Sequence, residues 1–177
     1  MPFYSEKYLT ELCHGYAEIS GKRDNLLIDF MQLPLANERA REYSLQGFSR
    51  RVRILVRCIH NVFAILPPER DDPPTMEENA DATISIQTFM INVFGAIDNL
   101  AWIWVCEKNV TDDEGNSLPN RYVGLGARNS RVRKSFSKEF QEYLETMAEW
   151  FEGMGDFRDG LAHRFSSYIP PYTITQE

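Results

Sequence analysis

The N-terminal part of the chain alternates apolar and polar residues with the period of an α-helix. Apolar residues recur three or four positions apart over residues 3–19 and again over residues 24–33. Gly21 and Pro34 follow these two stretches, and both residue types commonly end helices. The pattern therefore predicts a helix over residues 3–19 and a short second helix over residues 24–33.

A longer helical pattern begins at Asn37, whose side chain can cap a helix N-terminus, and reaches Leu66. Pro67 ends it and opens a polar loop that continues to Pro74. We therefore expect one long helix here. The apolar residues that share its core-facing side are Leu45, Phe48, Val52, Leu55, Val56, Ile59 and Phe63.

The clearest pattern lies between Met76 and Lys108, where apolar residues alternate in steps of four and three. The residues in this pattern are Ile86, Met90, Val93, Ile97, Leu100 and Trp104. The apolar run over residues 84–105 is long enough for a membrane span, but a carboxylate at Asp98 would be costly in lipid. We therefore interpret this segment as the central helix of a bundle and expect no membrane association.

The C-terminal part of the chain predicts a loop and two further helices. After a loop over residues 109–127, Ser137 is expected to cap an amphipathic helix that reaches Phe151. Gly153 and Gly155 predict the end of that helix. Asp156 is a suitable N-cap for a short final helix. Together these elements predict an all-α fold, an up-down bundle of about five helices.

Length and composition are consistent with this fold. A chain of 177 residues can bury the core of one domain, so we expect a single domain over residues 1–177. The 43% of hydrophobic residues and 12% of aromatic residues exclude a disordered chain. A net charge of -7 and a pI near 5.1 argue against a broadly basic nucleic-acid coat protein but allow a local basic cleft.

The cysteines indicate neither a disulfide framework nor a zinc site, because Cys13, Cys58 and Cys106 are widely spaced and form no C-x-x-C pair. We expect no metal ion and no other cofactor. The N-terminal residues lack the order of a secretory signal peptide. These features predict a reducing, cytoplasmic location.

Basic residues gather in two segments. Arg50, Arg53 and Arg57 are spaced to share one face of a helix, while Arg51 points elsewhere. This stripe can follow the phosphates of RNA, or it can be a solvated helix face. It becomes relevant to RNA chemistry if the fold brings it close to the histidine near the C-terminus.

The second basic segment covers residues 121–138, which contain no acidic residue. Arg128 and Arg131 are its candidates for RNA contact, and Tyr122 and Phe136 could stack on bases. The alternative is a basic turn that complements acidic surface elsewhere or on another subunit.

The candidate for acid–base chemistry lies near the C-terminus, in the sequence FRDGLAHR. His163 is one of three histidines and is flanked by Arg158, Asp159 and Arg164. On a helix, Asp159 and His163 would share a face, where a carboxylate favours the protonated imidazole. Arg158 and His163 would lie about 140° apart, so they converge only if Gly160 breaks the helix or a second chain contributes.

This run resembles the Arg-x4-6-His motif of the HEPN superfamily, small all-helical domains that include many metal-independent endoribonucleases. Arg158 and His163 take the motif positions, and Asp159 stands where the family places a polar residue, most often Asn. The resemblance extends over residues 76–171, because a long helix containing Asp98 is followed by a loop, another helix and the motif. It implies a HEPN-like fold.

Asp98 is unusual because the residues that share its helix face are nearly all apolar. A buried carboxylate without a partner is strongly unfavourable, so we expect one. One interpretation is a structural pair with any available group, which fixes the position of the helix. The resemblance implies another, in which Asp98 orients Arg158.

The resemblance implies cleavage of RNA without a metal ion. His163 would relay a proton to or from the reacting oxygens, and Arg158 would stabilise the charge on the phosphorus centre. One histidine is too few for separate acid and base roles, and HEPN nucleases supply the second from a symmetric dimer, so a homodimer is predicted. The catalytic candidates are Arg158, His163, Asp159 and Asp98, and the RNA-binding candidates are Arg50, Arg53, Arg57, Arg128, Arg131 and Arg164.

Two other interpretations stay open. The chain can be a non-catalytic HEPN-like domain that binds nucleotide or RNA or supports a partner protein such as an antitoxin. Alternatively, Arg158, Asp159 and His163 form a structural ion-pair network at a dimer contact. The acidic composition favours these two interpretations over a nuclease.

Overall fold

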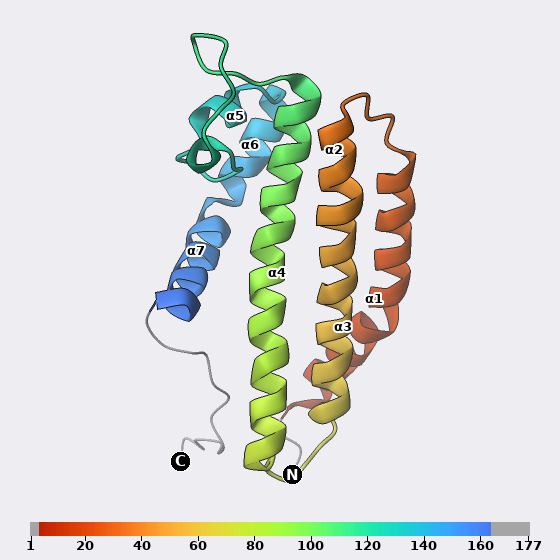
Figure 1. Ribbon diagram of the computed structural model, residues 1–177. Helices are drawn as coiled ribbons and strands as arrows, with labels where there is room; N and C mark the ends of the chain where they lie inside the picture. The colour runs from red at the N-terminus through yellow and green to blue at the C-terminus, as the bar shows by residue number, and fades with distance from the viewer. Residues whose placement is uncertain (1–3, 164–177) are drawn as a thin grey trace.

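Four long helices form the frame of the bundle. The computed structural model describes residues 4–163 and places α1 (Glu6–Gln32), α3 (Ser49–Ile65), α4 (Met76–Lys108) and α7 (Ala148–His163) side by side in that order (Figure 1). Neighbouring helices run in opposite directions, and no β-strand occurs in this part of the chain. The prediction of an all-α up-down bundle is confirmed.

The N-terminal segment is one helix, not the predicted two. Ser5 caps α1 by accepting a hydrogen bond from the backbone N–H of Tyr8 at 3.4 Å. Gly21 lies inside the helix, and no atom lies within 4 Å of the place that a Cβ would take. A glycine on an open helix face costs only about 1 kcal/mol, which the packing of α1 against α3 outweighs. The prediction that Gly21 ends the helix is therefore wrong.

The predicted helix after Asn37 is present, but it contains a π-helical turn. It comprises α2 (Glu38–Glu42), η1 (Tyr43–Phe48) and α3, and Asn37 caps it by accepting from the backbone N–H of Ala40 at 3.1 Å. The wider i→i+5 turn of a π-helix changes the direction in which side chains point. Leu45, predicted for the core, is consequently exposed.

The central helix α4 has the predicted bounds. Thr75 Oγ1 accepts the backbone N–H of Glu78 at 3.2 Å, and the Glu78 carboxylate accepts the backbone N–H of Thr75 at 2.7 Å, which forms a capping box. Asn109, in the left-handed region with φ 49°, ends the helix. α4 is long and apolar enough to cross a membrane, but the core helix of a soluble bundle can have the same length and composition.

Buried polar residues occur on α4 among the residues that pack against its neighbours. Ala96 and Ile103 are buried in one cluster with Phe48 and Val52 from η1 and α3. The polar residues buried on the same helix are Asn79, Ser85 and Asn92. Buried polar groups need partners inside the protein, so the contact between α3 and α4 is where a polar network is expected.

The chain after α4 covers the C-terminal end of that helix. A loop containing η2 (Asn120–Tyr122) leads to α5 (Ser130–Lys134) and α6 (Lys138–Thr146), which lie beside the end of α4 (Figure 1). Val132 and Leu144 from these short helices are buried in a second cluster with residues of α4. This end of the bundle is thereby closed, and α7 returns along α4.

The break before the last helix falls earlier than predicted. Ser137 caps α6 as expected, accepting from the backbone N–H of Phe140 at 3.3 Å. The helix ends at Met147, and Gly153 and Gly155 lie inside α7. Neither glycine has an atom within 4 Å of its Cβ position, so nothing forces the backbone to turn there. The predicted helix end at these glycines and the separate short helix after them are wrong.

Candidate functional site

Asp98, on the C-terminal half of α4, lies among three arginines from different parts of the chain. It is exposed, and within residues 4–161 no cation lies at ion-pair distance from its carboxylate. Neighbouring atoms still remove enough water to raise the pKa of Asp98, while Arg158, Arg51 and Arg128 act in the opposite direction, in that order of strength. The expectation of a buried carboxylate is therefore wrong, but its predicted neighbour Arg158 is close enough to act on it.

Arg158 is held by its own helix and by a ring on α4, not by Asp98. Its Nε donates to Oδ1 of Asp159 at 2.9 Å, and one terminal nitrogen forms an ion pair with the same oxygen at 2.8 Å. Its guanidinium carbon lies 5.3 Å from the centre of the Phe94 ring, one turn before Asp98 on α4. The direct Asp98–Arg158 pair that we expected is absent, because Arg158 bonds to the adjacent carboxylate.

Two neutral amide side chains on α4 hold Arg51 in place. Its Nε donates to Oδ1 of Asn99 at 3.1 Å, and a terminal nitrogen donates to Oδ1 of Asn92 at 3.2 Å. A Cβ on Gly95 would overlap the guanidinium, so the arginine lies directly against the helix backbone there. Amides orient the group without neutralising it, so its positive charge stays available to Asp98 and to a bound anion.

Neighbouring residues fix the two amides that hold Arg51. The amide of Asn92 donates to the backbone carbonyl of Thr88 at 2.8 Å, which leaves its oxygen facing the arginine. The side chain of Asn99 lies against Gly47 in the π-helical turn, where a Cβ would come within 2.7 Å. The π-helical turn, an element often found at functional sites, thus adjoins this network.

Of the two arginines chosen from the basic segment, only Arg128 belongs to the group around Asp98. Arg128 is exposed and acts on the Asp98 carboxylate. Arg131 instead forms an ion pair with Asp113 and donates to the backbone carbonyl of Thr111 at 3.2 Å. Arg131 therefore closes the loop after α4, and its role in RNA binding stays a prediction.

The motif residues lie on an unbroken helix. Gly160 does not interrupt α7, which extends to His163, so positions 158 and 163 lie about 140° apart around one axis. Asp159 accepts a hydrogen bond from Nε of Arg158, the residue before it on the same helix. Arg164, also proposed to contact RNA, lies outside the described residues. A site that uses both Arg158 and His163 at one phosphate thus requires a second chain.

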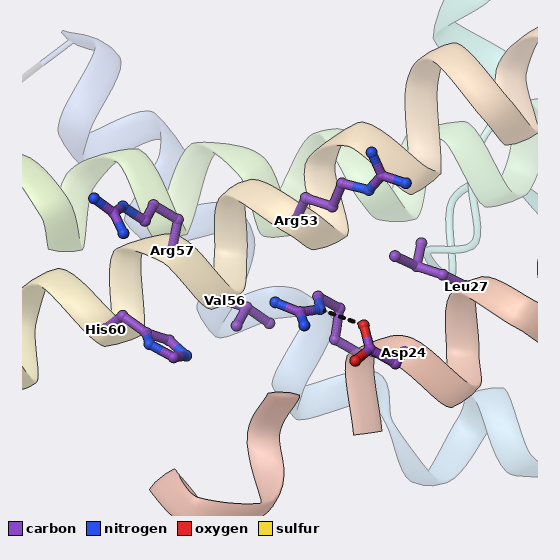
Figure 2. Close-up of a pocket in the computed structure, with 7 residues that line it drawn as sticks. Asp24, Leu27, Arg53, Val56, Arg57 and His60 are labelled. Atoms are coloured by element: carbon purple, nitrogen blue, oxygen red, sulfur yellow. Dashed lines mark hydrogen bonds and ion pairs between the residues drawn. The ribbon is translucent and has the colours of Figure 1, made fainter. Parts of the chain in front are cut away.

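The arginine stripe on α3 faces a different part of the bundle. Arg53 and Arg57 line a pocket of about 520 Å³ between α1 and α3, which Figure 2 shows. Arg50 is exposed and does not line that pocket. α7 packs on α4 and α1 on α3, so the stripe is separated from the motif. Its proposed contribution to RNA binding beside His163 is not supported by this placement.

The residues that complete the group around Asp98 were not found by sequence reasoning. In the sequence, Arg51 lies off the stripe of Arg50, Arg53 and Arg57, and Asn92 and Asn99 are polar positions in an apolar run. The signal that could have found them is a pair of asparagines around Gly95 inside an apolar helix, which indicates a close approach of another side chain.

The chemistry open to this group is the binding of an anion. Three guanidiniums from α3, α7 and the loop before α5 lie around one carboxylate, an arrangement suited to phosphate oxygens. Within residues 4–161, no cluster of three or more His, Cys, Asp or Glu side chains could hold a metal ion. Comparison of the chain with models of protein families, with curated proteins and with solved structures gave no match.

Proposed function

We propose that the protein is a metal-independent endoribonuclease of HEPN type, which cleaves cytoplasmic RNA at a site completed by a second copy of the chain. The observation that carries the proposal is that Arg158, the motif arginine, and Arg51 both lie on the part of α4 that contains Asp98. Arg158 lies over the ring of Phe94 and Arg51 lies against Gly95, and both act with Arg128 on the carboxylate of Asp98. Guanidiniums from three separate segments offer more donors than Asp98 alone can accept, and RNA phosphates can take the remaining ones.

The roles follow the resemblance to the family. His163 relays a proton between the ribose 2′-OH and the leaving 5′ oxygen, and Arg158 stabilises the negative charge that develops on the phosphorus centre. Asp98 attracts the three arginines by its charge, while Asn92, Asn99 and Asp159 provide the hydrogen bonds that hold Arg51 and Arg158. The products are a 2′,3′-cyclic phosphate and a 5′-hydroxyl, and no metal ion takes part.

The second histidine comes from a homodimer. Ile84 and Ile91 on α4 are 61% and 55% exposed. Ile84, Ile91 and Asp98 follow one another at intervals of seven residues. Residues spaced by seven share one side of a helix, so these apolar side chains point to the same side as the candidate site. A copy that packs on them would bring two motifs together across the contact.

The central experiment is cleavage of labelled single-stranded RNA by the purified protein in EDTA. We expect cleavage that leaves a cyclic phosphate and spares DNA, because the attacking group is the 2′-OH. His163→Ala should reduce the rate at least about a hundredfold while RNA affinity stays within about twofold. His14→Ala is the matched control, since that histidine is exposed on α1 and pairs only with Glu18.

The same preparation tests the dimer. Sedimentation at micromolar concentration should give a dimer for the wild type and for Ile28→Glu, a change at a residue of similar exposure on α1. Ile91→Glu should give a monomer without cleavage activity, because a charge cannot be buried at an apolar contact. RNA left intact by the wild type, or cleavage that survives the loss of His163, would exclude the nuclease.

A second candidate is a non-catalytic module that binds RNA or a partner protein. The observation that favours it is the unbroken α7, which keeps positions 158 and 163 apart in a single chain. In that case Arg158→Ala and His163→Ala should both weaken RNA binding, and no RNA should be cleaved.

A further inference from the structure

The pocket between α1 and α3 is a second place where positive charge gathers, on the other side of α3 from the group around Asp98. Arg23 and Asp24 come from α1, and Arg53 and Arg57 come from α3. Figure 2 shows Arg53, Val56, Arg57 and His60 following one another along α3, with Asp24 and Leu27 on α1 across from them. The pocket is thus formed by two helices that only the fold brings together.

Positive charge exceeds negative charge around this pocket. Asp24 is the only acidic lining residue in the part of the chain that the structure describes. It accepts from Nε of Arg23 at 2.8 Å, an interaction that lowers the pKa of Asp24. That bond leaves the terminal nitrogens of Arg23 without a partner among residues 4–163. Arg53 and Arg57 are exposed and form no ion pair in the same part of the chain. Three guanidiniums against one carboxylate leave an excess of two positive charges in a chain whose net charge is -7.

Arg53 and Arg57 carry like charges, and Figure 2 shows their guanidiniums extending away from one another along α3. They lie four residues apart on one helix, an arrangement that is repulsive when nothing lies between them. An anion bound by both would turn this repulsion into attraction, and a phosphate group offers the oxygens that two guanidiniums can share. In many proteins a carboxylate side chain pairs with two neighbouring arginines of this kind. Among the residues that line this pocket, no carboxylate pairs with Arg53 or Arg57.

The remaining lining of the pocket is apolar or aromatic. Leu27 and Val56 are 7% and 4% exposed, so they form a closed base. His60 lies at one end, with its ring centre 5.1 Å from that of Tyr16, and its Nε2 lies 3.3 Å from the hydroxyl of Ser20. A volume of about 520 Å³ matches pockets that hold small molecules. The site therefore suits a ligand with a charged end and an apolar body.

We propose that this pocket binds a small organic phosphate. The phosphate group draws the exposed side chains of Arg53 and Arg57 towards it, and the apolar part of the ligand lies against Leu27 and Val56. The terminal nitrogens of Arg23 face the ligand from α1 while Asp24 holds that arginine in place. This site is separate from the proposed nuclease site and does not depend on it.

Calorimetric titration with three probes tests the proposal on the full chain. Phenyl phosphate should bind at least about tenfold more tightly than inorganic phosphate, because only the former places apolar surface on the base of the pocket. Phenol should show no binding at the same concentrations, since it lacks the charge. Arg53→Ala and Arg57→Ala should each weaken phenyl phosphate binding about tenfold or more.

Arg50→Ala is the matched control, because it removes the same charge from an exposed position on the same helix, outside the pocket. It should leave the affinity for phenyl phosphate within about twofold, and circular dichroism should show that all three variants are folded. Equal losses for Arg50→Ala and Arg57→Ala would mean general attraction of anions and would overturn the proposal. Equal affinities for the two phosphates, or no binding of either at about 10 mM, would overturn it as well. Single-stranded RNA that loses affinity in Arg53→Ala while phenyl phosphate does not bind would assign these arginines to RNA instead.

Discussion

The arginines around Asp98 and those around the α1–α3 pocket differ in what holds them. Arg51 is fixed by two asparagine amides, and Arg158 by a carboxylate and an aromatic ring. Arg53 and Arg57 make no such contacts among the described residues, and they lie on α3 at the edge of a pocket with an apolar base. Fixed guanidiniums suit an anion whose geometry must be controlled, as in a reaction. Guanidiniums without fixed contacts suit an anionic group whose position is set by the apolar part of the same ligand.

This difference is not visible in the charge pattern of the sequence. Arg50, Arg51, Arg53 and Arg57 are all within eight residues of one another, yet they have different environments. One residue along a helix turns a side chain by about 100°, so adjacent arginines meet different neighbours. What an arginine can bind thus depends on the helix that it faces.

The largest expected effect separates the two groups by activity. Arg158→Ala should reduce RNA cleavage at least about a hundredfold, because it removes the group that stabilises charge at the phosphorus centre. Arg41→Ala, at an exposed position on α2, is the matched arginine control and should leave the rate within about twofold. Rates measured on one labelled RNA decide this. Equal rates for the two variants would show that Arg158 is not part of a catalytic site.

The next effect in size is the loss of folding stability when Arg51 is displaced from Asn92 and Asn99. Gly95→Ala forces the guanidinium out, which leaves Asn92 and Asn99 without their donor at a cost of roughly 1–3 kcal/mol. Gly21→Ala is the matched control, since nothing lies within 4 Å of its Cβ position, and it should stabilise α1 by up to about 1 kcal/mol. Urea unfolding of both variants measures the difference. A Gly95→Ala protein that is as stable as Gly21→Ala would show that Arg51 has no fixed place.

Arg70 provides a structural reference for both groups, because it bonds to two carboxylates. It lies 2.9 Å from both Asp72 and Glu78. The hydrogen bond from Arg70, followed by the bond from the backbone N–H of Thr75, lowers the pKa of Glu78 to about 2. A lowered carboxyl pKa stabilises the fold above its usual value of 4.5, and the effect is lost as the pH falls from 4.5 towards 2.

Glu78→Gln should therefore be less stable than the wild type at pH 6, and the two should converge as the pH approaches 2. Thermal unfolding at a series of pH values measures this. Glu77→Gln, on the same helix turn, is the control. A Glu78→Gln protein that keeps the wild-type pH dependence would show that the Arg70 pair does not affect folding.

The smallest expected effect concerns Asp98. Its pKa is raised in the folded protein, so its ionised form is less favoured there than in the unfolded chain. The fold consequently loses stability as the pH rises through the normal carboxyl range. Asp98→Asn should be slightly more stable than the wild type at pH 7, by less than about 1 kcal/mol because the residue is exposed, and equal to it at pH 3. A less stable Asp98→Asn at pH 7 would mean that the three arginines outweigh the loss of water.

Much of the fold could be predicted because helix boundaries depend on residues three or four positions apart. The caps at Asn37, Thr75 and Ser137 each bond to a backbone N–H three residues away. Gly21 and Gly155 misled the prediction because a glycine ends a helix only when the surrounding structure does not hold it straight. The candidate site was predicted in part: Asp98 and Arg158 are neighbours, but neither the exposure of Asp98 nor the role of Arg51 followed.

By itself, the sequence determined an all-α bundle, the bounds of its central helix and the residues of the Arg158 to His163 motif. Hydrophobic period and capping are local properties, so they can be read without knowing which helices meet. Only the tertiary structure decided which arginines surround Asp98, since Arg51 meets Asn92 and Asn99 across 41 and 48 positions of the chain. It also decided that Arg53 and Arg57 face α1, because the packing of α1 on α3 turns one side of a charged stripe into a pocket.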